Sequence, residues 1–501
     1  MMVLIGVIAC KEEPQEIQQE PIKTDFFASD TIINLHEEVS FTDLSTGNPT
    51  TWKWEFEGGK PNVSTGQNPK ILYESTGIYS VKLISQNSLS TDSNFKKEYI
   101  IVENSTPINF ELTWQKSIGE FNLSESVNSF IKTSDGGYMS SGSIWISNEN
   151  IDVCIVKYNH NLEVVWEKIF TGNFAERGSS LIETSDGKFI VAGSTNSTEG
   201  QIKSFNGSYD IFLLKFDNNG EIVWQKSYGG SEYEGCGNNS LIELSNGNFM
   251  ISGTCESNNG DVSKNIGGKD FWLVNLNNDG TIKWEKSFGG SQDEFSRQIF
   301  INNEALIVGL KSHSSDGDFS SAGNIVAKLS LDGEIIWVTN LSGMNYGKTI
   351  VDKNGGYISL IGNNENYSDF EVIKIDDLGS VLWKTSFGGS KQEYGTDLIQ
   401  LNDNSLIMLG LSSSNDGEII HNYGLSDDII VAKLSLTGKL LGVKNFGGSN
   451  REWADCLLDL GNGEYIVNAS TSSDDVDVIN NFGATGIDNW IIKITESTPN
   501  N

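Results

Sequence analysis

Residues 217–231 read DNNGEIVWQKSYGGS and residues 376–390 read DDLGSVLWKTSFGGS, and this recurring stretch decides the fold. Its pattern is Asp-x-x-Gly-x-x-x-Trp, followed by an aromatic residue and Gly-Gly-Ser. The segment recurs seven times after residue 110, at intervals of 46 to 60 residues, and internal repeats of this length are typical of propellers and solenoids. The seventh copy has Gly442 in place of Trp, and the other six have Trp114, Trp166, Trp224, Trp284, Trp337 and Trp383.

Each repeat contains four strand-like runs. In the third repeat the Trp-bearing run is followed by runs at 240–244, 249–253 and 271–276, and four strands per repeat form the blade of a β-propeller. The chain enters the repeats on a lone fourth strand, 112–118, and leaves them on a third strand, 489–494. The first strand is therefore expected to complete the last blade, which gives seven blades and no open sheet edge between first and last.

An Asp stands ahead of the third strand in six of the seven repeats, and its expected role is to accept hydrogen bonds from backbone groups. The six are Asp152, Asp210, Asp270, Asp369, Asp428 and Asp488. The turns on one face of the propeller are short and rich in Asn, Asp and Gly. The opposite face carries longer loops and the Gly-Gly-Ser crossovers between blades. Because binding residues more often lie on long loops of a rigid scaffold, this second face is the expected binding face.

The long-loop face is acidic. Each of five crossovers places a Glu six residues after the last apolar residue of the fourth strand. The candidate binding face consists of these residues: Glu176, Glu234, Glu294, Glu393 and Glu452. The alternative is that their side chains form hydrogen bonds between blades.

The long loops of this face add oxygen-rich, Gly-containing stretches, which suit Ca²⁺ although none has the spacing of an EF-hand. Ca²⁺ is the one cofactor that the sequence suggests, and solvated loops without a cation are the alternative. The candidate ligands are Asp261, Asp316, Asp318, Asp416, Glu418 and Asp475.

Composition excludes several functions. The chain has 501 residues and a net charge of −33, which disfavours nucleic acid because such binding requires Lys and Arg to neutralise phosphates. Proteins, sugars and divalent cations remain as partners. Four His are scattered without a repeated Ser or Cys partner, so a hydrolytic triad is not expected. The three Arg, at 177, 297 and 451, are too few for the arginine cluster of sialidases. No catalytic residue is predicted.

Two of the cysteines, Cys236 and Cys255, flank an expected hairpin at similar distances from its turn. They are placed to join as a disulfide in an exported protein, and two free thiols are the alternative.

Residues 25–104 alternate apolar and polar positions in short runs, which favours an antiparallel sandwich. The runs VSFTDLS at 39–45, WKWEF at 52–56 and GIYSVKL at 77–83 resemble the PKD family of immunoglobulin-like domains. The usual Gly-Asp-Gly of that family is replaced by EGG at 57–59. The resemblance implies a sandwich that acts as a spacer or adhesive module.

The first ten residues form an apolar run that resembles a bacterial lipobox, with Cys10 as the lipidated residue, and the following KEE resembles the export tag of Bacteroidetes-type lipoproteins. As a whole the chain resembles PKD-plus-propeller exported lipoproteins of flavobacterial type. That resemblance implies a monomer anchored by lipid at the outer membrane or cell surface, without a transmembrane helix. The expected parts are a signal-like segment (1–10), a linker (11–24), the sandwich (25–104), the propeller (110–495) and a tail (496–501).

Three functions agree with these observations. The first is a non-catalytic platform that binds polysaccharide or protein at the cell surface. The second is a glycoside hydrolase or lyase with carboxylates at the mouth of the propeller channel. The third is a purely structural module of the envelope or of a secretion assembly.

Overall fold

The computed structural model describes residues 20–118, 124–147, 150–204, 207–343, 345–362, 369–419, 422–424, 426–479 and 487–497. These residues contain strands and turns and no helix, which confirms the all-β class. None of them forms a helix able to cross a membrane. The chain divides into two compact units, residues 1–104 and 105–501, which are described separately.

The first unit is a sandwich of two sheets, and its centre is Trp54, fully buried between Phe26 and Phe41. Packing begins before residue 25, because Ile22 is buried and its N–H donates to Ser90 Oγ (2.7 Å). One sheet has the order β1 (Phe26–Ala28), β3 (Glu38–Asp43), β7 (Lys70–Tyr73), β5 (Gly59–Lys60). The other has the order β2 (Ile32–Asn34), β9 (Thr91–Glu103), β8 (Gly77–Gln86), β4 (Thr51–Phe56), β6 (Val63–Ser64).

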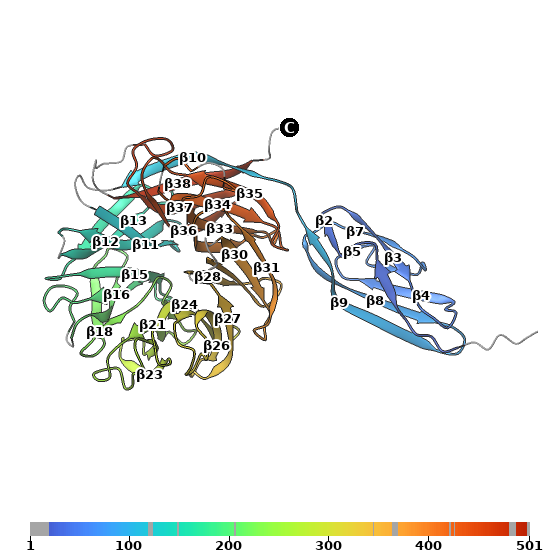
Figure 1. Ribbon diagram of the computed structural model, residues 1–501, viewed down its shortest axis with the longest axis horizontal. Helices are drawn as coiled ribbons and strands as arrows, with labels where there is room; N and C mark the ends of the chain where they lie inside the picture. Colours follow the sequence, from blue (N-terminus) through green and yellow to red (C-terminus); the bar gives the residue numbers. More distant parts are fainter. Residues whose placement is uncertain are drawn as a thin grey trace, which may run out of the picture. The chain divides into compact units, whose positions relative to one another are not determined.

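The second unit is a ring of seven antiparallel sheets, which confirms the β-propeller (Figure 1). Blade 1 comprises β11 (Ser124–Lys132), β12 (Tyr138–Trp145), β13 (Ile151–Tyr158) and β14 (Val164–Phe170). Blade 2 comprises β15 (Glu176–Glu183), β16 (Phe189–Thr195), β17 (Asp210–Phe216) and β18 (Ile222–Tyr228). Blade 3 comprises β19 (Glu234–Gly235), β20 (Leu241–Glu243), β21 (Phe249–Cys255), β22 (Asp270–Leu276) and β23 (Ile282–Phe288).

The remaining blades have the same order from the axis outward. Blade 4 comprises β24 (Glu294–Asn302), β25 (Ala305–Ser312), β26 (Gly323–Ser330) and β27 (Ile335–Ser342). Blade 5 comprises β28 (Asn345–Val351), β29 (Tyr357–Gly362), β30 (Phe370–Ile375) and β31 (Val381–Phe387). Blade 6 comprises β32 (Glu393–Gln400), β33 (Leu406–Ser412), β34 (Asp428–Leu434) and β35 (Leu440–Phe446). In blades 2, 3 and 6 the second and third strands are buried on both faces, as expected for sheets packed between sheets.

Blade 7 is closed by the strand that precedes blade 1. It comprises β36 (Glu452–Gly461), β37 (Glu464–Thr471), β38 (Asp488–Ser497) and, as its outer strand, β10 (Asn109–Ile118). The antiparallel pairing of β10 with β38 runs from Asn109↔Ser497 to Ile118↔Asn489, two residues past the expected end at 495. Figure 1 shows the two strands side by side at the top of the ring. The predicted closure of the ring is confirmed.

The recurring Trp joins neighbouring blades. Trp224, on the outer strand of blade 2, packs on Gly280 in the outer turn of blade 3, where an added Cβ would stand 3.3 Å from the ring. Between blades 1 and 2, the indole N–H of Trp166 also donates a hydrogen bond to the carbonyl of Asn218 in the outer turn of blade 2 (3.1 Å). Glycine is needed at this position of the turn because its φ is positive and the ring lies directly over it. The Asp-x-x-Gly-x-x-x-Trp pattern therefore describes contact between blades.

The exception at Gly442 has a physical reason. Ile108, which leads into β10, donates its N–H to the carbonyl of Leu441 (3.0 Å). A Cβ on Gly442 would collide with the carbonyl oxygen of Ile108. The seventh copy lacks the Trp because the strand that closes the ring passes over that position.

Candidate functional site: the axial pocket

The five recurrent Glu do not form an exposed face, which corrects that expectation. All are fully buried: Glu176, Glu234, Glu294, Glu393 and Glu452. Glu234 is representative, because its Oε2 accepts from the N–H of Gly230 in the crossover (2.8 Å) and its Oε1 from the N–H of Ser257 in the long loop (2.9 Å). These carboxylates hold each crossover to the blade that it enters, which differs from the hydrogen bonding between blades given as the alternative.

The structure adds a sixth member of this set, Glu125. Its N–H donates to the carbonyl of Ile487, just as that of Glu294 donates to the carbonyl of Lys269. Glu125 is also buried. It lies seven residues after Ile118 and not six, and that one-residue difference in spacing removed it from the sequence pattern.

The candidate Ca²⁺ ligands are hydrogen-bonded to the backbone of the crossovers. In blade 4, Asp316 Oδ1 accepts from the N–H of Ser291 (2.8 Å) and Asp318 Oδ2 from that of Gly289 (3.0 Å). Asp416, Glu418, Asp475 and Asp261 make the equivalent bonds to Ser390, Gly388, Ser449 and Gly229.

Across the described parts of the chain, no group of three His, Cys, Asp or Glu is arranged to hold a metal ion. The six candidate ligands are therefore not gathered as such a group, and the Ca²⁺ site stays a sequence-based prediction. The oxygen-rich loops fasten crossovers because each carboxylate accepts a backbone N–H that would otherwise lack a partner.

The cysteines are not joined. Cys236 and Cys255 are both free thiols in the structure, which is the second of the two alternatives. Burial raises the pKa of Cys236 to about 11 and that of Cys255 to about 12, so both are neutral at pH 7. The proposed lipidation residue, Cys10, lies outside the described residues.

A one-residue bulge interrupts the inner strand of six blades. In β24 the register shifts between Ser296 and Gln298, so that Arg297 has no opposite residue on β25. Each bulge comes close to the crossover end of its strand. β-bulges re-aim side chains and are frequent beside binding sites. The bulged residues differ from blade to blade: Asn128, Ser179, Arg297, Gly347, Thr396 and Asp455.

The inner strand of blade 3 has a longer interruption. Gly235 pairs with Thr254 and Leu241 pairs with Ile251, so residues 236–240 stand opposite Ser252 and Gly253 alone. The insertion splits this strand into β19 and β20, and Asn239 has a positive φ of 55°. Blade 3 therefore presents a small loop where the other blades present a single bulged residue.

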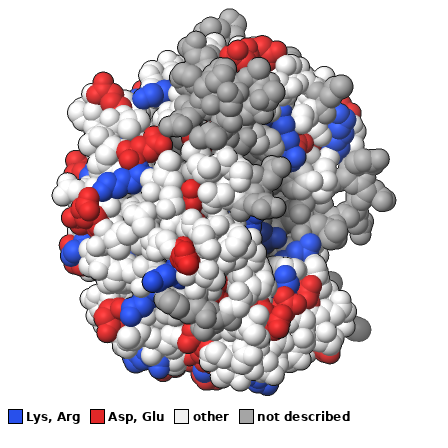
Figure 2. All heavy atoms as spheres, turned by 90° about the vertical axis from the view of Figure 1, so that its left-hand side faces the viewer, with Lys and Arg blue, Asp and Glu red and all other residues white. Residues whose placement is uncertain are grey.

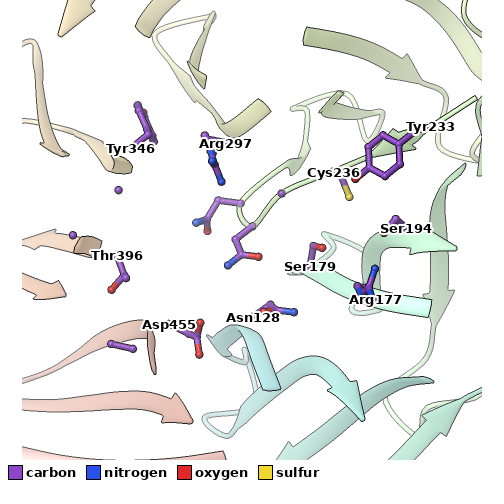
Figure 3. Close-up of a pocket in the computed structure, with 16 residues that line it drawn as sticks. Asn128, Arg177, Ser179, Ser194, Tyr233, Cys236, Arg297, Tyr346, Thr396 and Asp455 are labelled. Atoms are coloured by element: carbon purple, nitrogen blue, oxygen red, sulfur yellow. The ribbon is translucent and has the colours of Figure 1, made fainter. Parts of the chain in front are cut away.

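These bulges and the blade 3 loop line one pocket of about 410 Å³ on the propeller axis, to which all seven blades contribute (Figure 3). Besides the six bulged residues, Arg177, Ser194, Tyr233, Tyr346 and Gly237 to Asn239 line it. Most of these side chains are amides, hydroxyls or guanidiniums. Arg297 reaches the pocket from a bulge, whereas Arg177 pairs regularly with Ser194. Because the lining residues differ from blade to blade, the repeat pattern alone does not reveal the pocket.

The charge of the pocket differs from that of the whole chain. Arg177 and Arg297 are exposed in it, and neither forms an ion pair with any described residue, whereas Arg451, outside the pocket, pairs with Asp427 (2.9 Å). The carboxyl of Asp455 is the single acid of the described lining, and burial raises its pKa to about 7. On the side of the molecule shown in Figure 2, acidic and basic side chains are interspersed without a continuous patch of one sign.

Comparison with known proteins places the first unit in a family. Residues 20–102 match the PKD domain family, so the sandwich is a PKD domain that precedes the propeller. No curated protein matches the chain.

Among solved structures, the chain is similar to a quinoprotein alcohol dehydrogenase-like protein from Bacteroides thetaiotaomicron, with 12% identity, a TM-score of 0.34 and coverage of 84% of this chain and 95% of that one. It is similar to the Dos1 propeller, with 10% identity, a TM-score of 0.41 and coverage of 94% and 95%. It is also similar to the periplasmic gluconolactonase of Pseudomonas aeruginosa, with 10% identity, a TM-score of 0.39 and coverage of 72% and 97%. Likenesses at this level carry no argument about function.

Proposed function

We propose that this protein is a non-catalytic binding module of the cell surface and that the axial pocket of its propeller binds a saccharide. The observation that carries the proposal is the contrast within the repeats. The Trp, the Glu and the crossover Gly recur from blade to blade because they make the contacts that hold the blades and crossovers together. The bulged position that faces the axis, in contrast, has a different residue in each of six blades. A position used only for packing would repeat as the Trp does.

The chemistry of the lining suits a ligand rich in hydroxyls. The hydroxyls of Ser179 and Thr396 can donate and accept hydrogen bonds, as sugar hydroxyls do. Asn128 donates through Nδ2 to the carbonyl of Gly178 (2.7 Å), and its amide oxygen is an acceptor. A pocket of about 410 Å³ falls within the range of roughly 300–1,000 Å³ that holds small ligands. The pocket accommodates part of a saccharide chain, such as its end, more readily than a folded protein surface.

Hydrolysis of the saccharide has less support. A glycoside hydrolase needs two carboxyl groups, roughly 5–9.5 Å apart across the scissile bond. Asp455 is the one carboxyl in the described lining, and the crossover Glu residues are buried and hydrogen-bonded elsewhere. A purely structural role does not explain why polar side chains from all seven blades line one pocket. Binding without catalysis is therefore the function favoured here.

The cell-surface location rests on the N-terminal sequence. We propose that Cys10 carries the lipid anchor and that the PKD domain acts as the spacer between membrane and propeller. Labelling of the full-length protein with a fatty-acid analogue in a bacterial host tests this: label that persists in a Cys10→Ser variant would contradict it.

A glycan array probed with the protein lacking its first ten residues tests saccharide binding. The matched pair of variants is Thr396→Tyr, which fills the pocket, and Thr198→Tyr, on an exposed loop of blade 2. Glycan binding by the parent and by Thr198→Tyr, lost in Thr396→Tyr, is the expected result. Binding to no glycan at all would refute the proposal, as would equal binding by both variants.

A further inference from the structure

Two of the three arginines in a chain of net charge −33 line the axial pocket. They come from two different blades: Arg177 is the second residue of β15 in blade 2, and Arg297 is the bulged residue of β24 in blade 4. The loop of blade 3 lies between these two blades in the ring and contributes to the same lining. Figure 3 shows both arginine side chains among the lining residues.

The third arginine, Arg451, lies outside the pocket and has a carboxylate partner. Arg451 forms an ion pair with Asp427 (2.9 Å), and its guanidinium lies 5.0 Å from the ring centre of Trp453. Arg177 and Arg297 have no such carboxylate among the described residues. Both guanidiniums are open to the pocket, so an anion that enters it can pair with them without displacing a carboxylate.

The acid in the lining does not neutralise these cations fully. Asp455 comes from the bulge of blade 7, and burial holds its pKa near 7, so a large fraction of its carboxyl groups is protonated at neutral pH. In that form Asp455 donates a hydrogen bond and does not compete with an anion for the arginines. The neutral lining side chains, Asn128, Ser179 and Thr396, leave the balance of charge in the pocket positive.

We propose that the axial pocket binds an acidic saccharide, whose carboxylate or sulfate groups pair with Arg177 and Arg297 while its hydroxyls contact the neutral side chains of the other blades. The inference rests on the proposed binding function and names the class of ligand. Guanidinium groups suit both anions because their planar N–H fork matches two oxygens at once. Ala454 is the one aliphatic side chain of the described lining, in which hydroxyls, amides and guanidiniums predominate, and these groups suit a polar, anionic ligand.

The experiment compares acidic and neutral probes on the same protein. Isothermal titration is run on the chain lacking its first ten residues with three trisaccharides: α-1,4-linked galacturonate, α-1,4-linked galactose and sulfated galactose. A hexapeptide of glutamate is the fourth probe. The galacturonate and sulfated arms distinguish carboxylate from sulfate, and the galactose arm isolates the contribution of charge. Each titration is repeated at about 50 and 300 mM NaCl, because ionic contacts weaken with salt.

The variants are Arg177→Gln and Arg297→Gln, with Arg451→Gln as the matched control outside the pocket. At least one acidic trisaccharide is expected to bind more tightly than the neutral one, and each pocket variant to weaken its binding roughly 10- to 100-fold. Thermal unfolding confirms that each variant is folded.

Four results would overturn the inference. Equal affinity for galactose and the acidic probes, or equal affinity of Arg297→Gln and Arg451→Gln, refutes the anionic class but leaves saccharide binding standing. If the glutamate peptide binds more tightly than any saccharide, the ligand of the pocket is an acidic polypeptide and not a saccharide. Failure of all four probes, with an array that shows binding to neutral glycans alone, also refutes it, whereas an array without any binding refutes the proposed function itself.

Discussion

Asp428 and Glu452, from successive blades, bring one carboxyl oxygen each against the same crossover residue, Gly447. Asp428 Oδ1 and Glu452 Oε2 stand 2.8 and 2.6 Å from the position that a Cβ on Gly447 would occupy, and both side chains are fully buried. Asp270 and Glu294 approach Gly289 in the same manner. Two buried carboxylates this close repel each other, so protonation of one of them stabilises the pair.

The pairs predict that stability falls as pH rises from about 4 to 8. Burial raises the pKa of Asp428 to about 8, with Glu452 adding to the effect, whereas an unfolded Asp titrates near pH 4. The folded protein therefore holds a proton that the unfolded chain releases, and this contribution to stability is complete below about pH 4 and lost through pH 8. Each such proton accounts for at most about 1.4 kcal/mol per pH unit.

Thermal unfolding midpoints across this range provide the measurement. Asp428→Asn keeps the shape of the side chain and removes the titration, so its midpoint is expected to vary less with pH than that of the parent. Asp332→Asn, at an exposed turn, is the control and is expected to keep the parental slope. An unchanged slope in Asp428→Asn would show that the buried pair is not the cause.

The Trp contact between blades gives a second prediction. Gly280 has a φ of +79°, and a Cβ there would meet Lys226 Cγ at 3.0 Å, Tyr228 at 3.2 Å and Trp224 at 3.3 Å. Gly187 has a nearly equal φ, +72°, and open space around the same position. Gly187→Ala is expected to cost about 1 kcal/mol for backbone strain alone, and Gly280→Ala about 1–2 kcal/mol more. Urea unfolding measures both, and equal losses would mean that the Trp packing adds nothing.

Gly442 gives a third prediction, in which restoring the repeat harms the protein. Gly442→Trp recreates the pattern of the other six copies but forces a large ring into the path of Ile108, whose carbonyl already leaves no room for a Cβ. The expected loss in the free energy of unfolding is roughly 1–3 kcal/mol or more, as for other overpacked sites. A variant as stable as the parent in urea would mean that β10 does not enter over this position.

The sequence predicts the blades better than it predicts the site, for physical reasons. The blade count and the closure by β10 follow from periodicity and phase, which depend on backbone spacing. Burial of Glu234 does not follow, because its place on the long-loop face says nothing about where its side chain points. Acidic, Gly-containing loops suit both Ca²⁺ and backbone N–H groups, and in Asp316 and Asp318 they bind N–H groups.

The axial pocket is the feature that is hardest to predict from the sequence. A bulge is a property of pairing between two strands, so that Arg297 looks like an ordinary member of β24 until its register with β25 is known. The signal that was present is indirect: the residue three positions after the recurrent Glu is Ser179, Arg297, Thr396 or Asp455, and it does not repeat. Variation inside a strict repeat marks a position that the architecture leaves free.

The loop of blade 3 gives the last prediction. Residues 236–240 oppose two residues of β21, whereas each neighbouring bulge adds a single residue, so this blade carries two residues more than the pattern requires. Deletion of Gly237 and Asn238 shortens the interruption to the one-residue bulge that six other blades already tolerate. The propeller is therefore expected to fold with a thermal midpoint within a few degrees of the parent, since the ladder on either side is kept.

The axial pocket, in contrast, loses part of its wall, and the affinity for its saccharide is expected to fall at least roughly tenfold because hydrogen bonds to the loop are removed. Titration and thermal unfolding of the same sample separate the two effects: a large drop in the midpoint would assign the loop to the architecture, whereas a stable propeller with weakened binding assigns it to the ligand.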